Sequence, residues 1–244
     1  MRSWELVKRN LRETVRDPLS VGVTVALPLG LMLMLGLLGR QIPDQAPQLS
    51  ATMLAPGVTL FGFAMLVFSS GFLLARDREG ALLSRLLTAP LRPTDFIAAY
   101  SLPYLPVAIS QMVAIFAIGV LLGLVVSGSA VLVFLVLLVM AVGYIGLGML
   151  LGSVLTSQQV GFAYAVVLLP TIFSGAWFEL EVFGPGFTAA MNLLPFAHAL
   201  DATRDVMVDG AGFGDIAGDF FWVLGYSNAF FILGVFAFRR RMVE

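Results

Sequence analysis

The sequence predicts an all-α integral membrane protein with six transmembrane helices. Hydrophobic residues make up 59% of the 244 residues, charged residues only 12%, and the mean hydropathy is +0.95. A water-soluble chain of this size could not bury so much apolar surface. Because about 20 apolar residues in a helix span the hydrocarbon of a bilayer, long stretches without Asp, Glu, Lys or Arg indicate crossings. The chain has four such stretches, at residues 18–39, 45–75, 96–178 and 220–238.

The longest of these stretches is long enough for three crossings. Small and polar residues at 127–129 and again at 153–159 predict the turns between them. The predicted spans are therefore residues 19–39, 54–75, 98–125, 130–152, 159–178 and 220–238.

The basic residues predict the orientation. They precede the first span, follow the second and follow the sixth, and only Arg40 and Arg204 fall on the opposite side. Cytoplasmic loops carry the excess of Lys and Arg, so both termini are expected in the cytoplasm of a multi-pass protein of the cytoplasmic membrane. The last outer loop is acidic.

The first 17 residues predict an amphipathic helix that lies in the membrane interface. Trp4, Val7, Leu11 and Val15 share one face at helical spacing, and charged residues occupy the other faces until Pro18. A basic segment that only fixes the topology is the alternative interpretation.

The cytoplasmic loop between spans two and three predicts a short docking helix at about residues 78–90. Leu82, Leu83, Leu86 and Leu87 form one apolar face of a helix too short to cross the membrane. A groove on another protein is the usual cover for such a face. A helix lying flat on the lipid headgroups is the alternative.

The outer segment at residues 179–219 predicts a cap of short re-entrant or interfacial helices before the last span. Its apolar pieces near 183–187 and 192–207 are separated by Gly and Pro and are too short to span. Arg204, close to Asp201 and Asp205, predicts a local ion pair, with a substrate contact as the alternative. His198 is expected to be a polar packing residue of the cap.

Two motifs in these loops resemble the permease subunits of type-2 ATP-binding-cassette exporters, particularly small drug-resistance and lipid-export members. The first is REGALLSRLLTAPLRPTDFIAAY at residues 78–100, and the second is NLLPFAHALDATRDVM at residues 192–207. The resemblance covers the whole chain as a single domain, 1–244. It departs from the family pattern at Ala81 and Arg85, where Thr and Glu are usual.

The resemblance implies site residues by position. The residues expected to couple the chain to an ATPase are Glu79, Gly80, Leu82, Leu83, Leu86, Leu87, Ala89 and Pro90. The outer-cap residues are Pro195, His198, Asp201 and Arg204. The implied partners are two ATPase subunits, which would hold ATP and Mg, and a second permease chain in a homodimer or heterodimer.

The expected function is export of a hydrophobic or amphipathic substrate, such as a drug, lipid or natural product. A polysaccharide or glycolipid exporter of the same family is the alternative, and a secondary transporter is a third class. The third class normally has ionisable residues at membrane depth, and the six predicted spans have none. Gln111 and Asn228 lie within spans, where each could line a substrate path or bridge two helices.

Several classes of chemistry are disfavoured by residue counts. The only Lys is Lys8, which lacks the flanking glycines of a phosphate-binding loop, so ATP hydrolysis is expected on a separate subunit and this chain is not expected to be an enzyme. With one His and no Cys, no metal site and no zinc hydrolase is expected. The net charge of −1 gives no case for nucleic acid as a partner.

Overall fold

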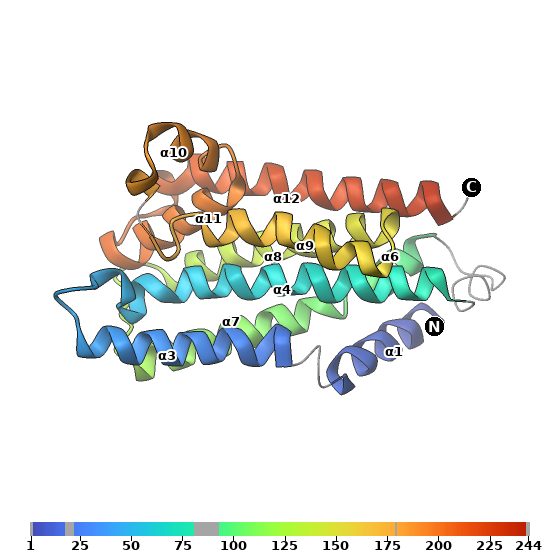
Figure 1. Cartoon of the computed structure of the whole chain (residues 1–244), viewed down its shortest axis with the longest axis horizontal. Helices are drawn as coiled ribbons and strands as arrows, with labels where there is room; N and C mark the ends of the chain where they lie inside the picture. Colours follow the sequence, from blue (N-terminus) through green and yellow to red (C-terminus); the bar gives the residue numbers. More distant parts are fainter. Residues whose placement is uncertain (1, 18–21, 81–92, 179, 243–244) are drawn as a thin grey trace.

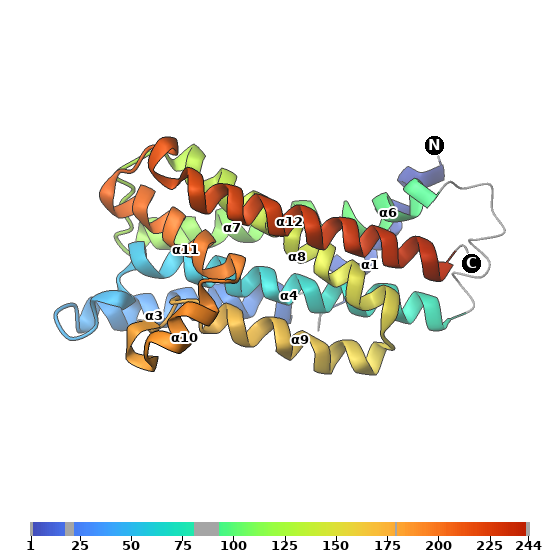
Figure 2. The same cartoon turned by 90° about the horizontal axis from the view of Figure 1, so that it is seen from above.

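The computed structural model describes residues 2–17, 22–80, 93–178 and 180–242. All regular secondary structure in these ranges is helical, which confirms the predicted all-α fold. The long helices run side by side, and both ends of the chain lie at the same end of the bundle (Figures 1 and 2). We call this the terminal end and the opposite one the cap end. The main helices are α1 (Arg2–Arg16), α3 (Leu27–Gln41), α4 (Ala51–Glu79), α6 (Pro93–Ser101), α7 (Tyr104–Leu121), α8 (Ala130–Val154), α9 (Ser157–Ile172) and α12 (Phe213–Met242).

Five segments of the described chain are long and apolar enough to cross a membrane. They are Thr24–Gln41, Ala51–Glu79, Asp95–Leu121, Ala130–Val154 and Phe213–Arg240. The fifth predicted span, 159–178, overlaps α9, which has 16 residues and therefore a length of about 24 Å, less than the bilayer core. Apolar length and composition thus identify five of the six predicted spans.

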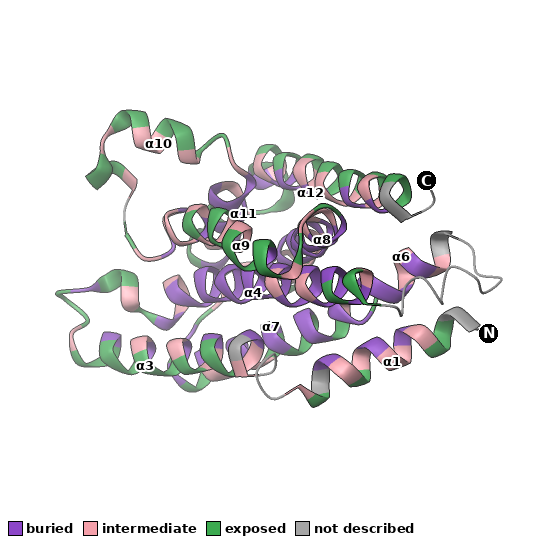
Figure 3. Cartoon of the chain, turned by 45° about the vertical axis from the view of Figure 1, so that its right-hand side comes forward, coloured by how far each residue is buried: buried purple, intermediate pink, exposed green. Residues whose placement is uncertain are grey.

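Helix α4 forms the centre of the bundle and is buried along nearly its whole length (Figure 3). It packs on α8 and α9, with α3 and α7 on another side. Glycines allow the close approach to α8: a Cβ at Gly152 would lie 2.5 Å from the carbonyl oxygen of Gly71. Small residues at such crossings are what membrane helices use to pack backbone against backbone.

Several helix ends differ from the predicted span boundaries. The third predicted span is broken at residues 102–103, where Pro103 lacks an N–H, and α7 ends at Leu121 before Gly123, whose φ is +92°. The last helix begins at Phe213 instead of residue 220, so Asp215 and Asp219 lie in its first turns and not in the loop. In the described part of the first span, a π-helical segment, η1 (Gly22–Ala26), precedes α3.

Short helices cover the cap end before α12 begins. They are η2 (Pro47–Leu49), η3 (Leu180–Phe183), α10 (Pro185–Met191), α11 (Pro195–Arg204) and the π-helical η4 (Asp205–Asp209). Backbone N–H groups of Ser127 and Gly128, in the turn between α7 and α8, donate to Met207 and Val206 of η4 at 2.9 and 3.0 Å. The cap is therefore joined to the bundle by backbone hydrogen bonds.

Candidate functional site

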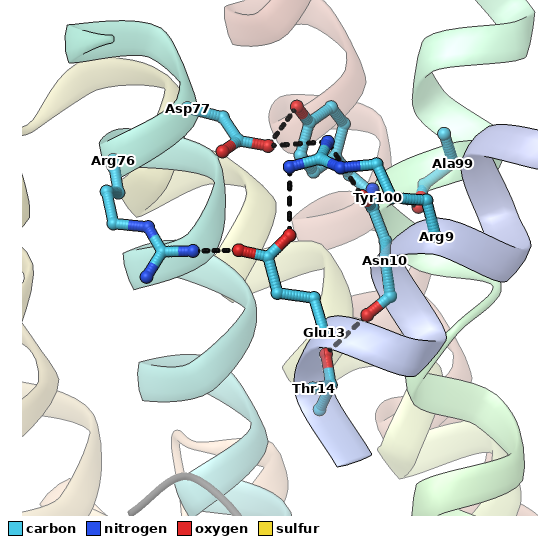
Figure 4. A network of polar contacts seen from close by, with 8 residues as sticks. All are labelled: Arg9, Asn10, Glu13, Thr14, Arg76, Asp77, Ala99 and Tyr100. Carbon is cyan, nitrogen blue, oxygen red and sulfur yellow. Dashed lines mark hydrogen bonds and ion pairs between the residues drawn. The ribbon is translucent and has the colours of Figure 1, made fainter. Parts of the chain in front are cut away.

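A network of charged side chains joins three helices at the terminal end (Figure 4). Arg9 of α1 donates to Glu13 at 2.8 Å and to Asp77 of α4 at 3.3 Å. Glu13 also accepts from Arg76, and Asp77 accepts a 2.8 Å hydrogen bond from the hydroxyl of Tyr100 in α6. The network therefore ties α1 to α4 and α6, the two helices that flank residues 81–92.

Asp77 is the buried member of this network, with 5% of its surface exposed. Burial by itself would lower the pKa of the Arg9 guanidinium, but the charge and hydrogen bond of Asp77 and the charge of Glu13 outweigh it and raise the pKa. The Arg9 guanidinium thus has an acidic partner on α4 as well as one on its own helix. Removing one member of such a pair leaves an uncompensated charge in a poorly hydrated place.

A second set of contacts fastens α1 to α6 through polar side chains. The Asn10 amide donates to the carbonyl oxygen of Ala99 in α6 at 2.9 Å, and within α1 the Thr14 hydroxyl donates to the carbonyl oxygen of Asn10 at 2.9 Å. Val7, Asn10 and Thr14 are buried, whereas Trp4 is 57% exposed. The buried face of α1 is therefore partly polar; it includes Val7 of the predicted apolar stripe, whereas Trp4 of that stripe is exposed.

The last turn of α4 also binds the turn between α8 and α9. Glu79 accepts two hydrogen bonds from Ser157, 2.8 Å from its backbone N–H and 2.7 Å from its hydroxyl. Arg78 donates to the carbonyl oxygens of Ser153 and Leu155. Because the first N–H groups of a helix lack partners within it, a carboxylate at this place stabilises the start of α9.

Most of the expected ATPase-coupling residues lie outside the described part of the chain. Leu82, Leu83, Leu86, Leu87, Ala89 and Pro90 are in the undescribed range 81–92. The expected helix was to begin at about residue 78, but residues 78 and 79 belong to α4, and Gly80 is extended with φ −83° and ψ 163°. Of this set, the structure thus places only Glu79 and Gly80, at the point where α4 ends.

Gln111 bridges two helices inside the bundle. It is fully buried, and its amide donates to the carbonyl oxygen of Thr24 in η1 at 2.9 Å. That carbonyl lies four residues before Pro28, which has no N–H to bond it within the helix. Gln111 therefore supplies the donor that Pro28 lacks, and this supports the bridging interpretation.

Asn228, the other polar residue considered for a substrate path, is remote from this contact. It lies on the exposed face of α12, where its amide donates to the carbonyl oxygen of Leu224 in the same helix at 2.9 Å. The structure does not bring Gln111 and Asn228 together.

His198 joins three segments at the cap end. Its Nδ1 lies 2.6 Å from Asp219 Oδ1 of α12, and its Nε2 lies 2.8 Å from the carbonyl oxygen of Asn192. Its ring also contacts that of Trp222, with centroids 5.3 Å apart. Pro195 occupies the first turn of the same helix, α11, where a missing N–H costs nothing. These contacts position α11 on α12.

Arg204 fastens the cap to the bundle through carbonyl oxygens. Its guanidinium donates to Met53 at 3.0 and 3.3 Å, to Gly175 at 2.8 Å and to Ala176 at 3.3 Å. Burial lowers the pKa of Arg204, and the charge of Asp201 opposes that change. The ion pairs of the described residues do not include Arg204, so the predicted local pair with Asp201 or Asp205 is wrong.

The residues that sequence reasoning missed are those of the terminal-end network. Asp77, between Arg76 and Arg78, and Tyr100 lie near the ends of two spans, and Asn10 lies three positions after Val7 on the same helix face. A polar residue on the apolar side of a helix was the available signal. Within the described ranges, no group of three or more His, Cys, Asp or Glu residues could hold a metal ion.

Comparison with known proteins adds family evidence to this geometry. The model of the ABC-2 type transporter family matches residues 2–208. The chain is similar to the inner membrane transport permease YhhJ of Escherichia coli strain K12, with 25% identity over 70% of this chain and 47% of that protein. It is also similar to the probable multidrug ABC transporter permease YbhR of the same strain, with 26% identity over 69% of this chain and 46% of that protein.

A third relative comes from another organism. ABC transporter G family member 20 of Dictyostelium discoideum is 26% identical over 65% of this chain and 22% of that protein. The chain thus matches about half the length, or less, of these curated relatives.

Proposed function

The chain belongs to the ABC-2 type transporter family, and we propose that it is the permease subunit of an ATP-driven exporter for hydrophobic or amphipathic substrates. In this proposal it pairs with a second permease chain and with two ATPase subunits, which bind ATP and Mg. The family match and the apolar helices of the bundle support this role.

We propose that α9 is the fifth of six crossings and that the terminal end faces the cytoplasm. Both chain ends lie at one end of the bundle, as an even number of crossings requires (Figure 1). That end also carries most of the basic residues, including Arg9, Arg76 and Arg239. Glycosylation or labelling of single cysteines in this Cys-free chain can test the orientation.

The observation that carries the proposal is the attachment of both helices that flank residues 81–92. Asp77 of α4 and Tyr100 of α6 meet in one hydrogen bond, and Arg9 joins them to α1. Glu79 extends the attachment to α9. A displacement of residues 81–92 by an ATPase would therefore be transmitted to α1, α4, α6 and α9. Such a connection is needed if ATP hydrolysis at one end of the bundle is to move the whole bundle.

A matched pair of double variants tests this assignment. Leu86→Ala with Leu87→Ala should remove apolar contact with the ATPase, since a buried Leu contributes about 1.5–3 kcal/mol. Leu33→Ala with Leu37→Ala changes two exposed residues of α3 and serves as the control. We expect only the first pair to lose ATPase copurification and ATP-driven transport. Full transport by the first pair contradicts the coupling role.

We place the second permease chain against the exposed side of α9. Gly161 and Ala165 are small residues one turn apart on that side, which permits close helix approach. Phe162 and Val166 beside them are 82% and 71% exposed. A single cysteine at Ala165 should cross-link two chains, whereas one at Val131 on α8, 79% exposed, should not. Cross-linking at Val131 alone would move the interface away from α9.

The energy source separates this proposal from a secondary transporter. In the described spans, charged residues lie near helix ends, and none lies at the middle of a helix to carry a proton. Transport in reconstituted vesicles should therefore continue without a proton gradient and stop without ATP. The reverse result supports the secondary transporter.

A further inference from the structure

The cap end contains a hollow of about 390 Å³, which we call the cap hollow. Its walls come from η2, the start of α4, the segment after α9, α10 and α11. Met53, Phe178 and Leu180 supply apolar surface, and Glu181, Asn192 and Asp201 supply polar groups. Ligand sites in proteins commonly have this size and this mixture of apolar walls with a few polar groups.

Glu181, Asp201 and Arg204 are the charged side chains that line the cap hollow, and the candidate binding group is the Asp201 carboxylate. No residue in the described part of the chain donates a hydrogen bond to it or forms an ion pair with it. The nearby guanidinium of Arg204 is committed to the carbonyl oxygens of Met53, Gly175 and Ala176. His198, one turn earlier on α11, is committed to Asp219.

The environment of Asp201 makes its negative charge unfavourable. Solvent reaches the side chain, but the surrounding walls replace much of its hydration, and this burial raises the pKa of Asp201 to about 6. The positive charge of Arg204 lowers the pKa of Asp201, and the negative charges of Asp219 and Asp205 raise it further. A cation bound in the hollow would compensate this charge.

We propose that the cap hollow binds the ammonium group of an amphipathic amine, with Asp201 as the counter-ion and Met53, Phe178 and Leu180 against the apolar body. The exposed ring of Phe178 adds a face that attracts cations. This assignment names a substrate class for the proposed exporter, bound at its outer side. The role of this binding in transport rests on the proposed function, whereas the binding itself does not. The ammonium group can belong to a soluble lipophilic cation or to an aminophospholipid headgroup.

Binding to the purified full-length permease tests the assignment without an ATPase. The probe is rhodamine 6G, a fluorescent lipophilic cation, and its affinity is measured by fluorescence polarisation. Asp201→Asn should weaken binding about tenfold or more, because a hydrogen bond or contact to a charged group has that value. Asp209→Asn removes an exposed acid of the same cap outside the hollow and should leave the affinity unchanged. Equal losses in both variants would indicate only surface charge and overturn the assignment.

Competition on the unaltered protein keeps the test valid if a variant does not fold. Dodecylammonium should displace the probe, and dodecanol, which has the same chain without the charge, should not. Equal displacement by the two overturns the counter-ion role of Asp201.

The pH dependence supplies an independent readout. Affinity should fall as the pH is lowered through about 6, where Asp201 takes up its proton, and Asp201→Asn should remove this response. The other charged or titratable groups around Asp201 are Arg204, Asp205, Asp219, His198 and Glu181. His198→Gln should therefore keep the response. If Asp201→Asn retains the response and His198→Gln loses it, the assignment is wrong.

Two lipid compositions distinguish the source of the amine. Nanodiscs of phosphatidylglycerol alone are compared with nanodiscs that also contain phosphatidylethanolamine. If the headgroup is the ligand, phosphatidylethanolamine should weaken probe binding to the unaltered protein and not to Asp201→Asn. If a soluble cation is the ligand, the two nanodiscs should give the same affinity. Probe binding without any ATP-driven transport would reject the proposed function alone, and transport without Asp201-dependent binding would reject this assignment alone.

Discussion

The two ends of the bundle are held together by different chemistry. At the terminal end, Arg9, Glu13, Arg76 and Asp77 form ion pairs between side chains of α1 and α4. At the cap end, Arg204 binds carbonyl oxygens, η4 bonds the turn between α7 and α8 through backbone groups, and one side-chain pair, His198 with Asp219, joins α11 to α12. The terminal end thus has a connected network of charges between long helices, whereas the cap end is fastened mainly through carbonyl oxygens, and Asp201 has no partner there among the described residues. This difference fits an end that receives force and an end that binds or releases a ligand.

The largest expected effect tests the cap end. Arg204→Met leaves the carbonyl oxygens of Met53, Gly175 and Ala176 without their donor, so the free energy of unfolding should fall by about 2–4 kcal/mol. Arg40→Met, which changes an exposed Arg at the same end, should alter it by no more than about 0.5 kcal/mol. Equilibrium unfolding in mixed detergent micelles measures both. Similar values for the two variants would show that Arg204 does not hold the cap.

The second prediction tests the terminal end. It compares how far salt changes the loss of stability at this end and at the cap end. Asp77→Asn removes the charge that pairs with Arg9 and weakens the acceptor of Tyr100, so we expect a loss of about 1–3 kcal/mol. Arg9 is partly exposed, so salt should reduce this loss, and salt should have little influence on the effect of Arg204→Met. A double-mutant cycle with Arg9→Gln measures the pair directly. No coupling energy between the two sites would contradict the network.

Sequence reasoning found the parts of this comparison that depend on continuous patterns. Apolar stretches identified five segments that are long and apolar enough to cross a membrane, and the motifs around residues 78–100 and 192–207 identified the family that the comparisons confirm. The partners of Arg204 were missed because acids three positions before it and one after it suggested a local pair. The guanidinium instead reaches carbonyls at Met53 and Gly175, which are distant in sequence.

The terminal-end network was missed for a related reason. Asp77 and Tyr100 are 23 positions apart and meet only because α4 and α6 return to the same end of the bundle. No periodic pattern within one helix encodes such a contact. Likewise, Gln111 and Pro28 are individually common features of membrane helices, and only the fold shows that the amide of one serves the carbonyl freed by the other.

A third, smaller effect concerns the start of α9. Glu79→Ala removes both acceptors of Ser157, so amide hydrogen exchange in the first turn of α9 should become faster. The change in global stability should be smaller than that of Asp77→Asn, because Glu79 is exposed and the capping box between Thr156 and Gln159 remains. Glu181→Ala at the cap end is the matched control. Unchanged exchange in Glu79→Ala would mean that α4 and α9 are not joined through this carboxylate.

The smallest expected effect concerns Asp201, the acid of the cap that has no partner in the described part of the chain, in contrast to Glu13 and Asp77, the paired acids of the terminal end. Burial raises the pKa of Asp201 to about 6, from an ordinary value of 3.8, so the folded protein holds this proton more tightly than the unfolded chain does. Protonation therefore favours folding, and the charged form lowers stability above pH 6. Asp201→Asn, which is always neutral, should be more stable than the unaltered protein at pH 7.5. Because solvent reaches the side chain, this advantage should be below about 1 kcal/mol. It should disappear as the pH falls from 6 towards 4, and Asp209→Asn supplies the baseline. An advantage that stays constant over this range would show that Asp201 keeps the same pKa in the folded and unfolded states, and that the cap hollow does not disfavour its charge.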